Sequence, residues 1–291
     1  MPRTMTQVQT WQKIARNWAN FTAPSRPSLG DCKVYELWTK RTLSTLRSPN
    51  ILVLGVTPEI RNLLFKYSLT QDAKVYLADI NKGMFRAMRA FLNFNNPNEY
   101  FKPCNWLKMP FQREFFDFII GDLVITNLAL KDKEKFLKEI KRLLKEEGRF
   151  VTRILVYKEN RNRNFNLSQV LNQYFQQYQK AQLSLRDTLG YFYSAIVQET
   201  YYLNEKGEYS LKYLIADFEK LRKEIKDPLK KIFLGKFLKD YHSVLDDKVW
   251  VGMTQPAHER LVKKHFQIEK IESVRDHPFG DRYLIYVLKK K

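Results

Sequence analysis

The stretch Ile51-Leu52-Val53-Leu54-Gly55-Val56-Thr57-Pro58-Glu59 decides the fold of this chain. Its first four residues form a short apolar run of the kind that is buried in a parallel β-sheet. Gly55 then lets the backbone turn tightly. Thr57 suits a helix N-cap, Pro58 the first helical position and Glu59 the first turn. The stretch therefore predicts a strand that turns directly into a helix, whose N-terminus favours an anionic ligand group.

Outward from this stretch, strands and helices alternate. A second strand over Lys74–Ala78 ends at Asp79. The same patterns predict helices over Asn81–Asn93 and Lys131–Lys145, and strands over Tyr100–Leu107, Phe115–Ile120 and Arg149–Val156. Such alternation is typical of a parallel, doubly wound sheet, in which the carboxyl ends of the strands share one ligand-binding edge.

The flanking segments read differently. Thr4–Asn20 and Leu29–Leu46 have helical spacing, and Ser28 followed by Asp31 suits the start of the second helix. Residues 158–248 are polar and rich in aromatic side chains, and they exceed the length of a plain connection. Within them we expect helices over Phe165–Leu185 and Phe218–Tyr241, and a hairpin of Ala195–Leu203 with Tyr209–Leu214. After them we expect a helix over Gln255–His265 and an antiparallel pair over Phe266–Val274 and Arg282–Lys289.

The predicted fold is α/β, with a doubly wound, mostly parallel seven-stranded sheet. Residues 1–49 form an N-terminal helical segment or lid, and residues 50–157 and 249–291 form a Rossmann-like domain. Residues 158–248 form a mainly helical insertion before the last two strands, where substrate specificity or a lid is expected.

Composition limits the function classes. The 291 residues include only two cysteines, which excludes a disulfide framework and a cysteine-rich zinc site, and we predict no metal. No apolar run is long enough to span a membrane, and the N-terminus lacks the pattern of a signal peptide, so we expect a cytoplasmic protein. The net charge of +20 is spread along the chain. It fits either a generally lysine-rich protein or an anionic partner such as RNA.

Asp79 is the second functional signal. An acidic residue at the end of the second strand can accept hydrogen bonds from both hydroxyls of a ribose, as nucleoside cofactors require. The alternative is that Asp79 only caps the following helix.

These motifs, in this order, resemble the class I S-adenosylmethionine-dependent methyltransferases, with a Rossmann-like fold. The resemblance covers about residues 50–157 and the terminal strands. It rests on Ile51–Glu59 (ILVLGVTPE), Val75–Phe85 (VYLADINKGMF), Asn105–Phe111 (NWLKMPF), Phe116–Leu128 (FDFIIGDLVITNL), Phe136–Val151 (FLKEIKRLLKEEGRFV) and Phe279–Lys290 (FGDRYLIYVLKK).

The resemblance implies S-adenosylmethionine as cofactor and gives each motif a place along it. Asp79 would hold the ribose. The other implied contacts are Gly55, Val56 and Thr57 to the methionine part, Ile80, Met84, Asn105 and Trp106 around the adenine, and Gly121, Asp122 and Leu123 beneath the sulfonium. For Met84 and Trp106, plain core packing is the alternative.

One departure bears on the cofactor's amino group. Where the family often has an acid two residues before the first glycine, this chain has Val53. We hypothesise that Glu59, Asp122 or both supply the negative charge. Arg26, in the loop Pro24-Ser25-Arg26-Pro27, could pair with the cofactor's carboxylate, or the loop could be a stiff connector.

The predicted activity is methyl transfer to an unidentified, small-molecule acceptor. The alternatives are a methyltransferase that acts on RNA or an anionic protein, and an inactive cofactor-binding module. The segment Asp122-Leu123-Val124-Ile125 lacks the motif of nucleic-acid base N-methyltransferases, and we assign no catalytic residue and no oligomeric state.

Overall fold

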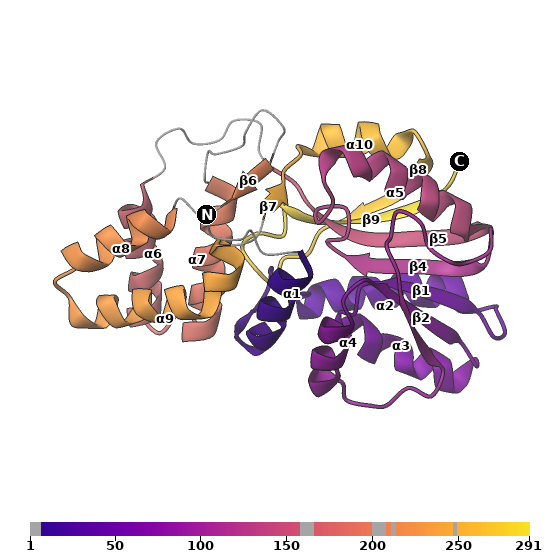
Figure 1. Cartoon of the computed structure of the whole chain (residues 1–291), viewed down its shortest axis with the longest axis horizontal. Coiled ribbons are helices and arrows are strands. Elements are labelled where there is room, and N and C mark those ends of the chain that lie inside the picture. Colours follow the sequence, from indigo (N-terminus) through magenta and orange to yellow (C-terminus); the bar gives the residue numbers. More distant parts are fainter. Residues whose placement is uncertain (1–6, 158–165, 200–207, 211–213, 247–248) are drawn as a thin grey trace. The chain divides into compact units, whose positions relative to one another are not determined.

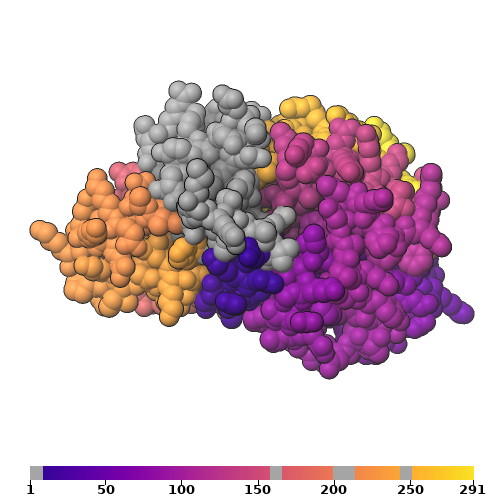
Figure 2. Space-filling model, viewed as in Figure 1, coloured from indigo at the N-terminus to yellow at the C-terminus, as the bar shows by residue number. Residues whose placement is uncertain are grey.

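The computed structural model describes residues 7–157, 166–199, 208–210, 214–246 and 249–291. The chain divides into two compact units (Figure 1, Figure 2). One, here the Rossmann unit, comprises residues 27–157 and 253–291. The other, here the helical unit, comprises residues 1–26 and 158–252. The boundaries differ from those expected, because residues 27–49 belong to the Rossmann unit and residues 249–252 to the helical unit.

The Rossmann unit contains the predicted seven-stranded sheet, in the order β3-β2-β1-β4-β5-β9-β8. Strands β3, β2, β1, β4 and β5 are mutually parallel, and β9 runs antiparallel to both β5 and β8. The strands are β1 (Asn50–Leu54), β2 (Lys74–Asp79), β3 (Glu99–Pro103), β4 (Phe116–Asp122), β5 (Leu144–Leu155), β8 (Phe266–Glu272) and β9 (Tyr283–Lys290). The predicted fold class is confirmed.

Helices cover both faces of this sheet. Figure 1 places α5 and α10 on one side and α2, α3 and α4 on the other. Their bounds are α2 (Leu29–Leu43), α3 (Pro58–Thr70), α4 (Lys82–Met88), α5 (Leu130–Leu143) and α10 (Gln255–Lys263), with the short 3-10 helix η2 (Arg89–Phe91) after α4. The helix α5 buries Phe136, Leu137, Ile140 and Leu143, which recur at helical spacing and pack on the apolar side chains of β4 and β5.

Two predicted helix starts have different outcomes. At α2 the capping box is present, because the Ser28 hydroxyl accepts the Asp31 N–H and the Asp31 carboxylate accepts the Ser28 N–H, both at 2.9 Å. At α3 the residue in the N-cap position is Thr57, and Pro58 follows it as expected. The Thr57 side chain, however, makes no capping hydrogen bond with any described residue. The N–H groups in the first turn of α3 can therefore donate to another partner.

The helical unit contains α1 (Gln7–Arg16), η1 (Trp18–Asn20), α6 (Leu167–Gln179), α7 (Leu185–Glu199), α8 (Leu214–Glu224) and α9 (Pro228–Asp246). A short antiparallel pair joins β6 (Glu208–Ser210) to β7 (Val249–Val251). Aromatic rings form much of its core, including Phe175, Phe192, Phe218, Phe233, Phe237 and Tyr241.

Two predictions for this unit are wrong. Ala195–Glu199 continue the helix α7 and are not a strand, because α7 is a core helix that is buried on nearly all sides from Thr188 to Val197. The rest of the expected first strand, residues 200–203, lies outside the described residues. The strand β6 pairs with β7 instead. The single helix expected over Phe218–Tyr241 is two helices, since Asp227 and Pro228 start α9 and the Asp227 carboxylate accepts the Leu229 N–H at 2.9 Å.

Candidate functional site

The carboxyl edge of the sheet contains a topological switch point between β1 and β4. After β1 the chain proceeds to β2 on one side, and after β4 it proceeds to β5 on the other. Parallel sheets bind ligands in the crevice at this point. The candidate residues Gly55, Asp79 and Asp122 follow or end β1, β2 and β4, so the fold brings three of the predicted positions to one edge.

Gly55 turns the chain at this edge with a backbone φ of 90°, which favours glycine. A Cβ atom placed on Gly55 would lie 3.8 Å from the Trp106 ring and 3.9 Å from Asp79 Oδ2, which are ordinary contact distances. The Trp106 indole is held in place because its Nε1–H donates to the Ala78 carbonyl at 2.6 Å. Gly55, Asp79 and Trp106 therefore lie close together, with the Asp79 carboxylate and the Trp106 ring next to the side of Gly55 that lacks a side chain.

Asp79 is not the cap of the following helix. Asn81 is the N-cap of α4, and its side-chain oxygen accepts the Met84 N–H at 2.9 Å. The Asp79 Oδ1 atom accepts the Asn81 N–H at 2.7 Å, which leaves Oδ2 directed toward Gly55. Burial raises the pKa of Asp79 to about 6, and backbone N–H groups oppose that rise only in part. The carboxylate thus has no cationic partner among the described residues that lowers its pKa.

The residues expected around an adenine lie next to Asp79 and Trp106 in the chain. Met84 is buried in the first turn of α4. Ile80 is 57% exposed, an unusual state for an isoleucine that follows a sheet strand. The Asn105 side chain accepts the Leu107 N–H at 2.9 Å and so fixes the turn that presents Trp106. Val56, on the methionine side, is buried.

The end of β4 is tightly packed and strained. A Cβ atom on Gly121 would lie 2.9 Å from the Leu54 Cβ atom, so glycine is needed for β4 to pack beside β1. Two residues later, Leu123 has a φ of 54°, in the left-handed region that costs a non-glycine residue on the order of 1 kcal/mol. The Leu123 N–H donates to the Arg153 carbonyl at 3.1 Å, which holds this turn against β5.

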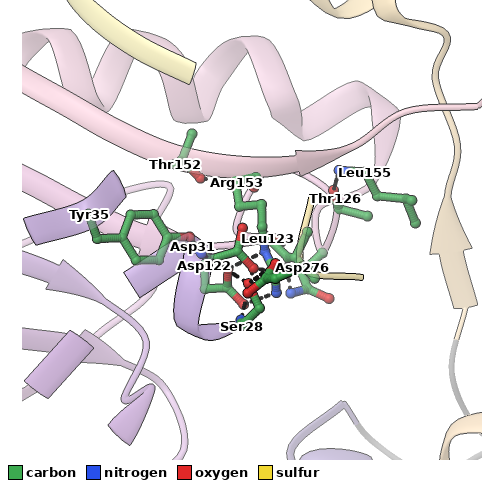
Figure 3. Close-up of polar contacts among 11 residues, drawn as sticks. Ser28, Asp31, Tyr35, Asp122, Leu123, Thr126, Thr152, Arg153, Leu155 and Asp276 are labelled. Carbon is green, nitrogen blue, oxygen red and sulfur yellow. Dashed lines mark hydrogen bonds and ion pairs between the residues drawn. The ribbon is translucent and has the colours of Figure 1, made fainter. Parts of the chain in front are cut away.

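Asp122 belongs to a buried ionic cluster (Figure 3). The guanidinium of Arg153, on β5, donates through Nε to Asp122 Oδ1 at 2.8 Å and through Nη2 to Asp122 Oδ2 at 3.0 Å. Its Nη1 donates to Asp31 Oδ2 at 2.6 Å, and the Tyr35 hydroxyl donates to Asp122 Oδ1 at 2.8 Å. We call these four residues, Asp31, Tyr35, Asp122 and Arg153, the Arg153 cluster.

The N-terminal turn of α2 is fixed by a second acid. Asp276, in the loop between β8 and β9, accepts the Gly30 N–H at 2.6 Å and the Ser28 hydroxyl at 3.0 Å. Because Asp31 of the same turn pairs with Arg153, the β8–β9 loop and the strand β5 both hold the start of α2. These contacts hold the first turn of α2 at the carboxyl edge of the sheet.

The start of α3 faces the same region. Cys32, on the first turn of α2, has a pKa raised to about 12 by burial and then by the negative charges of Glu59, Asp31 and Asp122. These three carboxylates, from α3, α2 and β4, therefore lie near enough to Cys32 to raise the pKa of its thiol. The edge of the sheet carries acid groups at its β1–β4 side, where Glu59 and Asp122 were expected to act.

Comparisons with known proteins agree with this geometry. Residues 59–152 match a family model described as a methyltransferase domain. A search of curated proteins finds no match to the sequence. Among solved structures, similar folds include a proposed zinc-dependent alcohol dehydrogenase from Rhodobacter sphaeroides, with 12% identity, TM-score 0.59, and 99% of this chain and 100% of that one covered.

Two further similar structures are archaeal. A protein from Pyrococcus horikoshii has 16% identity and TM-score 0.52, with 89% of each chain covered. A proposed methyltransferase from Haloferax volcanii, solved with the Trm112 methyltransferase activator, has 11% identity and TM-score 0.50, with 98% of each chain covered. At these identities the structural likenesses establish the fold alone. The family match bears out the resemblance of the Rossmann unit to the class I S-adenosylmethionine-dependent methyltransferase superfamily.

The matched range of this methyltransferase domain contains Asp79, Trp106 and Asp122 but ends before Arg153. Arg26, expected at the cofactor's carboxylate, belongs to the helical unit. There its guanidinium lies over the Trp18 indole, 5.7 Å from the ring centroid. Its role toward the cofactor stays a prediction. In the described part of the chain no three His, Cys, Asp or Glu side chains gather as a metal site would require, and no helix is long and apolar enough to cross a membrane.

Sequence reasoning missed Arg153, Asp31 and Tyr35 as parts of the site. The signal for Arg153 was present, because it is the single charged residue in the apolar run Phe150–Val156. A charge in a strand that must be buried on both faces needs a buried partner. The partners are 122 and 31 residues away along the chain, so pattern reading could not identify them.

Proposed function

We propose that the methyltransferase domain binds S-adenosylmethionine along the edge from Trp106 to Asp122 and transfers its methyl group to a small-molecule acceptor. The observation that carries this proposal is the geometry of Asp79. Its Oδ2 faces the bare backbone of Gly55 beside Trp106, while Asn81 alone caps α4. A carboxylate with an open oxygen next to a glycine turn and an indole fits the ribose and adenine of a nucleoside.

The residues present fit the whole cofactor. The carboxylate of Asp79 accepts both ribose hydroxyls, and the uncapped N–H groups at the start of α3 lie where the methionine carboxylate would bind. The acid groups that act on Cys32 belong to the same methionine end, which suits a sulfonium and an ammonium. Along this edge we assign the adenine to Ile80, Met84, Asn105 and Trp106, the methionine part to Gly55, Val56, Thr57 and Glu59, and the sulfonium to Gly121, Asp122 and Leu123.

Methyl transfer from a sulfonium is an in-line displacement, in which the acceptor atom attacks the methyl carbon and the sulfur leaves with the electron pair. Positioning of donor and acceptor and exclusion of water supply much of the acceleration, and a general base is optional. In this chain the strained turn at Leu123, pinned to Arg153, is the rigid platform for that geometry. No residue needs to take a proton for the proposal to hold.

The helical unit is the part of the chain to which we assign acceptor choice. Its buried core is dominated by aromatic rings, and its helices are inserted directly after β5, which ends at the ligand-binding edge of the sheet. The net charge of +20 favours a second candidate, an RNA or anionic-protein acceptor.

The test is cofactor binding by calorimetry with S-adenosylhomocysteine, the demethylated product. We expect wild-type protein to bind it and Asp79→Asn to bind it at least tenfold more weakly. Asp281→Asn is the matched control, because it removes an aspartate whose side chain is 68% exposed and lies on the β8–β9 loop. Absence of binding to wild-type protein would refute the proposal. Tight RNA binding whose affinity falls steeply with salt would favour the second acceptor class.

A further inference from the structure

Two aliphatic side chains in the first turns of α9 are exposed to solvent. Leu229 is 64% exposed and Ile232 is 67% exposed, and their spacing places them side by side on the helix surface. A different face of α9 packs into the core of the helical unit, where Phe233 and Phe237 are buried against other aromatic rings. Single exposed apolar residues are common on proteins, but two adjacent ones form a small apolar surface.

Positive charge is dense around this apolar pair. Residues 220–239, from the end of α8 to the middle of α9, include eight lysine and arginine residues and two acidic residues, which gives a net charge of +6. Lys236 and Lys239 continue the stripe of the apolar pair along α9, at the spacing that keeps side chains on one helix face. The guanidinium of Arg222, on α8, lies beside α9, because a Cβ atom on Gly235 would be 3.8 Å from its Nη2 atom.

Most of this charge has no internal partner. Lys236 pairs with Asp240 at 2.5 Å, and the Arg222 guanidinium lies 3.9 Å from the Glu219 carboxylate. Four exposed lysines of the same region form no ion pair with any described residue, namely Lys223, Lys226, Lys231 and Lys239. We call these four lysines, together with the two exposed aliphatic residues, the α8–α9 surface. The turn between its two helices lies at one end of the helical unit (Figure 1).

The chemistry of the α8–α9 surface matches that of an anionic lipid bilayer. Aliphatic side chains insert at the boundary of the acyl chains, while lysines extend their long stems and keep the ammonium among the negative headgroups. Protein interfaces, including those between two copies of one chain, are poor in lysine, whereas here lysines directly adjoin the apolar pair. Single-stranded nucleic acids stack their bases on exposed aromatic rings, and Leu229 and Ile232 have no ring.

We propose that the α8–α9 surface docks the protein on anionic lipid membranes. Leu229 and Ile232 enter the bilayer interface, and the surrounding lysines bind the negative headgroups. The contact is peripheral, since no helix in the described part of the chain is long and apolar enough to cross a membrane. The inference goes beyond the proposed function and does not depend on it, because α8 and α9 contribute no residue to the edge from Trp106 to Asp122.

Vesicle flotation of the full-length protein tests the inference. The vesicles consist of phosphatidylcholine alone, or of phosphatidylcholine mixed in equal parts with phosphatidylglycerol. We expect the wild-type protein to float with the mixed vesicles and not with phosphatidylcholine alone, and added salt should weaken the binding. Absence of binding to the mixed vesicles overturns the inference. Equal binding to both compositions overturns it as well, because the lysines would then contribute nothing.

Two double variants separate the apolar contribution from the basic one. The first, Leu229→Ser with Ile232→Ser, keeps every charge and should lower the partition coefficient on mixed vesicles about tenfold. The second, Lys231→Gln with Lys239→Gln, keeps the apolar pair and should lower the coefficient about 20-fold, because each lysine near an anionic surface contributes a factor of about five. A surface variant that binds mixed vesicles as tightly as wild type overturns the inference.

Matched controls come from the Rossmann unit. Leu69→Ser removes a leucine that is 62% exposed on α3, and Lys131→Gln with Lys135→Gln removes two exposed lysines from α5. Both controls should bind within about twofold of wild type, and a loss as large as that of the surface variants overturns the inference. Tight binding of single-stranded RNA without vesicle binding also overturns it. So does self-association in sedimentation velocity that the serine double variant abolishes, because the apolar pair would then meet a second copy.

Discussion

The pH dependence of cofactor binding is the sharpest consequence of the Asp79 geometry. Ribose hydroxyls donate to an ionised carboxylate, whereas the protonated acid has lost half of its acceptor capacity. Burial raises the pKa of Asp79 to about 6, so about one-eleventh of the free protein is ionised there at pH 5. We expect the affinity for S-adenosylhomocysteine to be about tenfold lower at pH 5 than at pH 8.

The same shift fixes the sign of the effect on stability. The folded protein holds the Asp79 proton more tightly than the unfolded chain, whose aspartate pKa is near 4. This contribution to stability is therefore complete below pH 4 and is lost as the pH rises through 6. Its size is at most about 3 kcal/mol, and smaller where solvent reaches the carboxylate. Asp79→Asn removes the buried charge, so the ligand-free variant should melt at a higher temperature than wild type at pH 7.5.

The assay is calorimetry from pH 5 to 8, with thermal denaturation of the same samples. Asp79→Asn should bind weakly with a flat pH profile, while Asp281→Asn should keep the wild-type profile. An affinity of wild-type protein that does not change between pH 5 and 8 would refute the role of Asp79. So would a steep profile that survives in Asp79→Asn, because another group would then be titrating.

Three further changes test other parts of the site. Gly55→Ala has room for its methyl group but not a favourable backbone at φ 90°, so urea denaturation should show a loss of about 1 to 2 kcal/mol, and cofactor affinity should fall. Lys133 is buried, donates to the Ile125 carbonyl at 2.7 Å and has a pKa lowered to about 7 by burial. Wild-type stability should therefore gain from this group between pH 7 and 10, and Lys133→Met should lack that gain in urea titrations at both pH values. Arg153→Met leaves Asp31 and Asp122 buried without their cation and should cost about 3 to 5 kcal/mol in urea denaturation; a loss below 1 kcal/mol would mean that the cluster is not ionised.

The Rossmann unit could be predicted from the sequence because its local signals agree with its tertiary structure. The apolar run before Gly55 is a central strand buried on both faces, and Lys131–Lys145 has the apolar spacing that α5 buries. The helical unit resisted prediction for the opposite reason. Its aromatic residues favour strands by propensity, and Ala195–Glu199 became helical because the packing of α7 outweighed that preference.

The positions of the candidate residues could be predicted where they follow from a place next to a strand, but not where they depend on long-range pairing. Asp79 and Trp106 could be placed because each lies at the end of a strand or just after one. Asp122 was placed at the correct edge, but its pairing was not foreseen. We expected Asp122 to supply negative charge to the cofactor. In the structure both of its carboxylate oxygens accept hydrogen bonds from Arg153, which balances that charge. Only the three-dimensional structure shows that Asp31 also pairs with Arg153.

The features at the carboxyl edge share an energetic property that ties the fold to the proposed function. Asp79 is held with a raised pKa, Leu123 is held in a left-handed conformation, and Asp31 keeps a buried oxygen without a donor among the described residues. Each of these states lowers the stability of the ligand-free protein. On the proposed function, we expect a nucleoside cofactor to relieve the first by donating its ribose hydroxyls to Asp79, and to leave the strained turn in place as a rigid platform. Stability is thus lowered at the edge where we propose that the cofactor binds, while the central strand β1 is buried and almost entirely apolar.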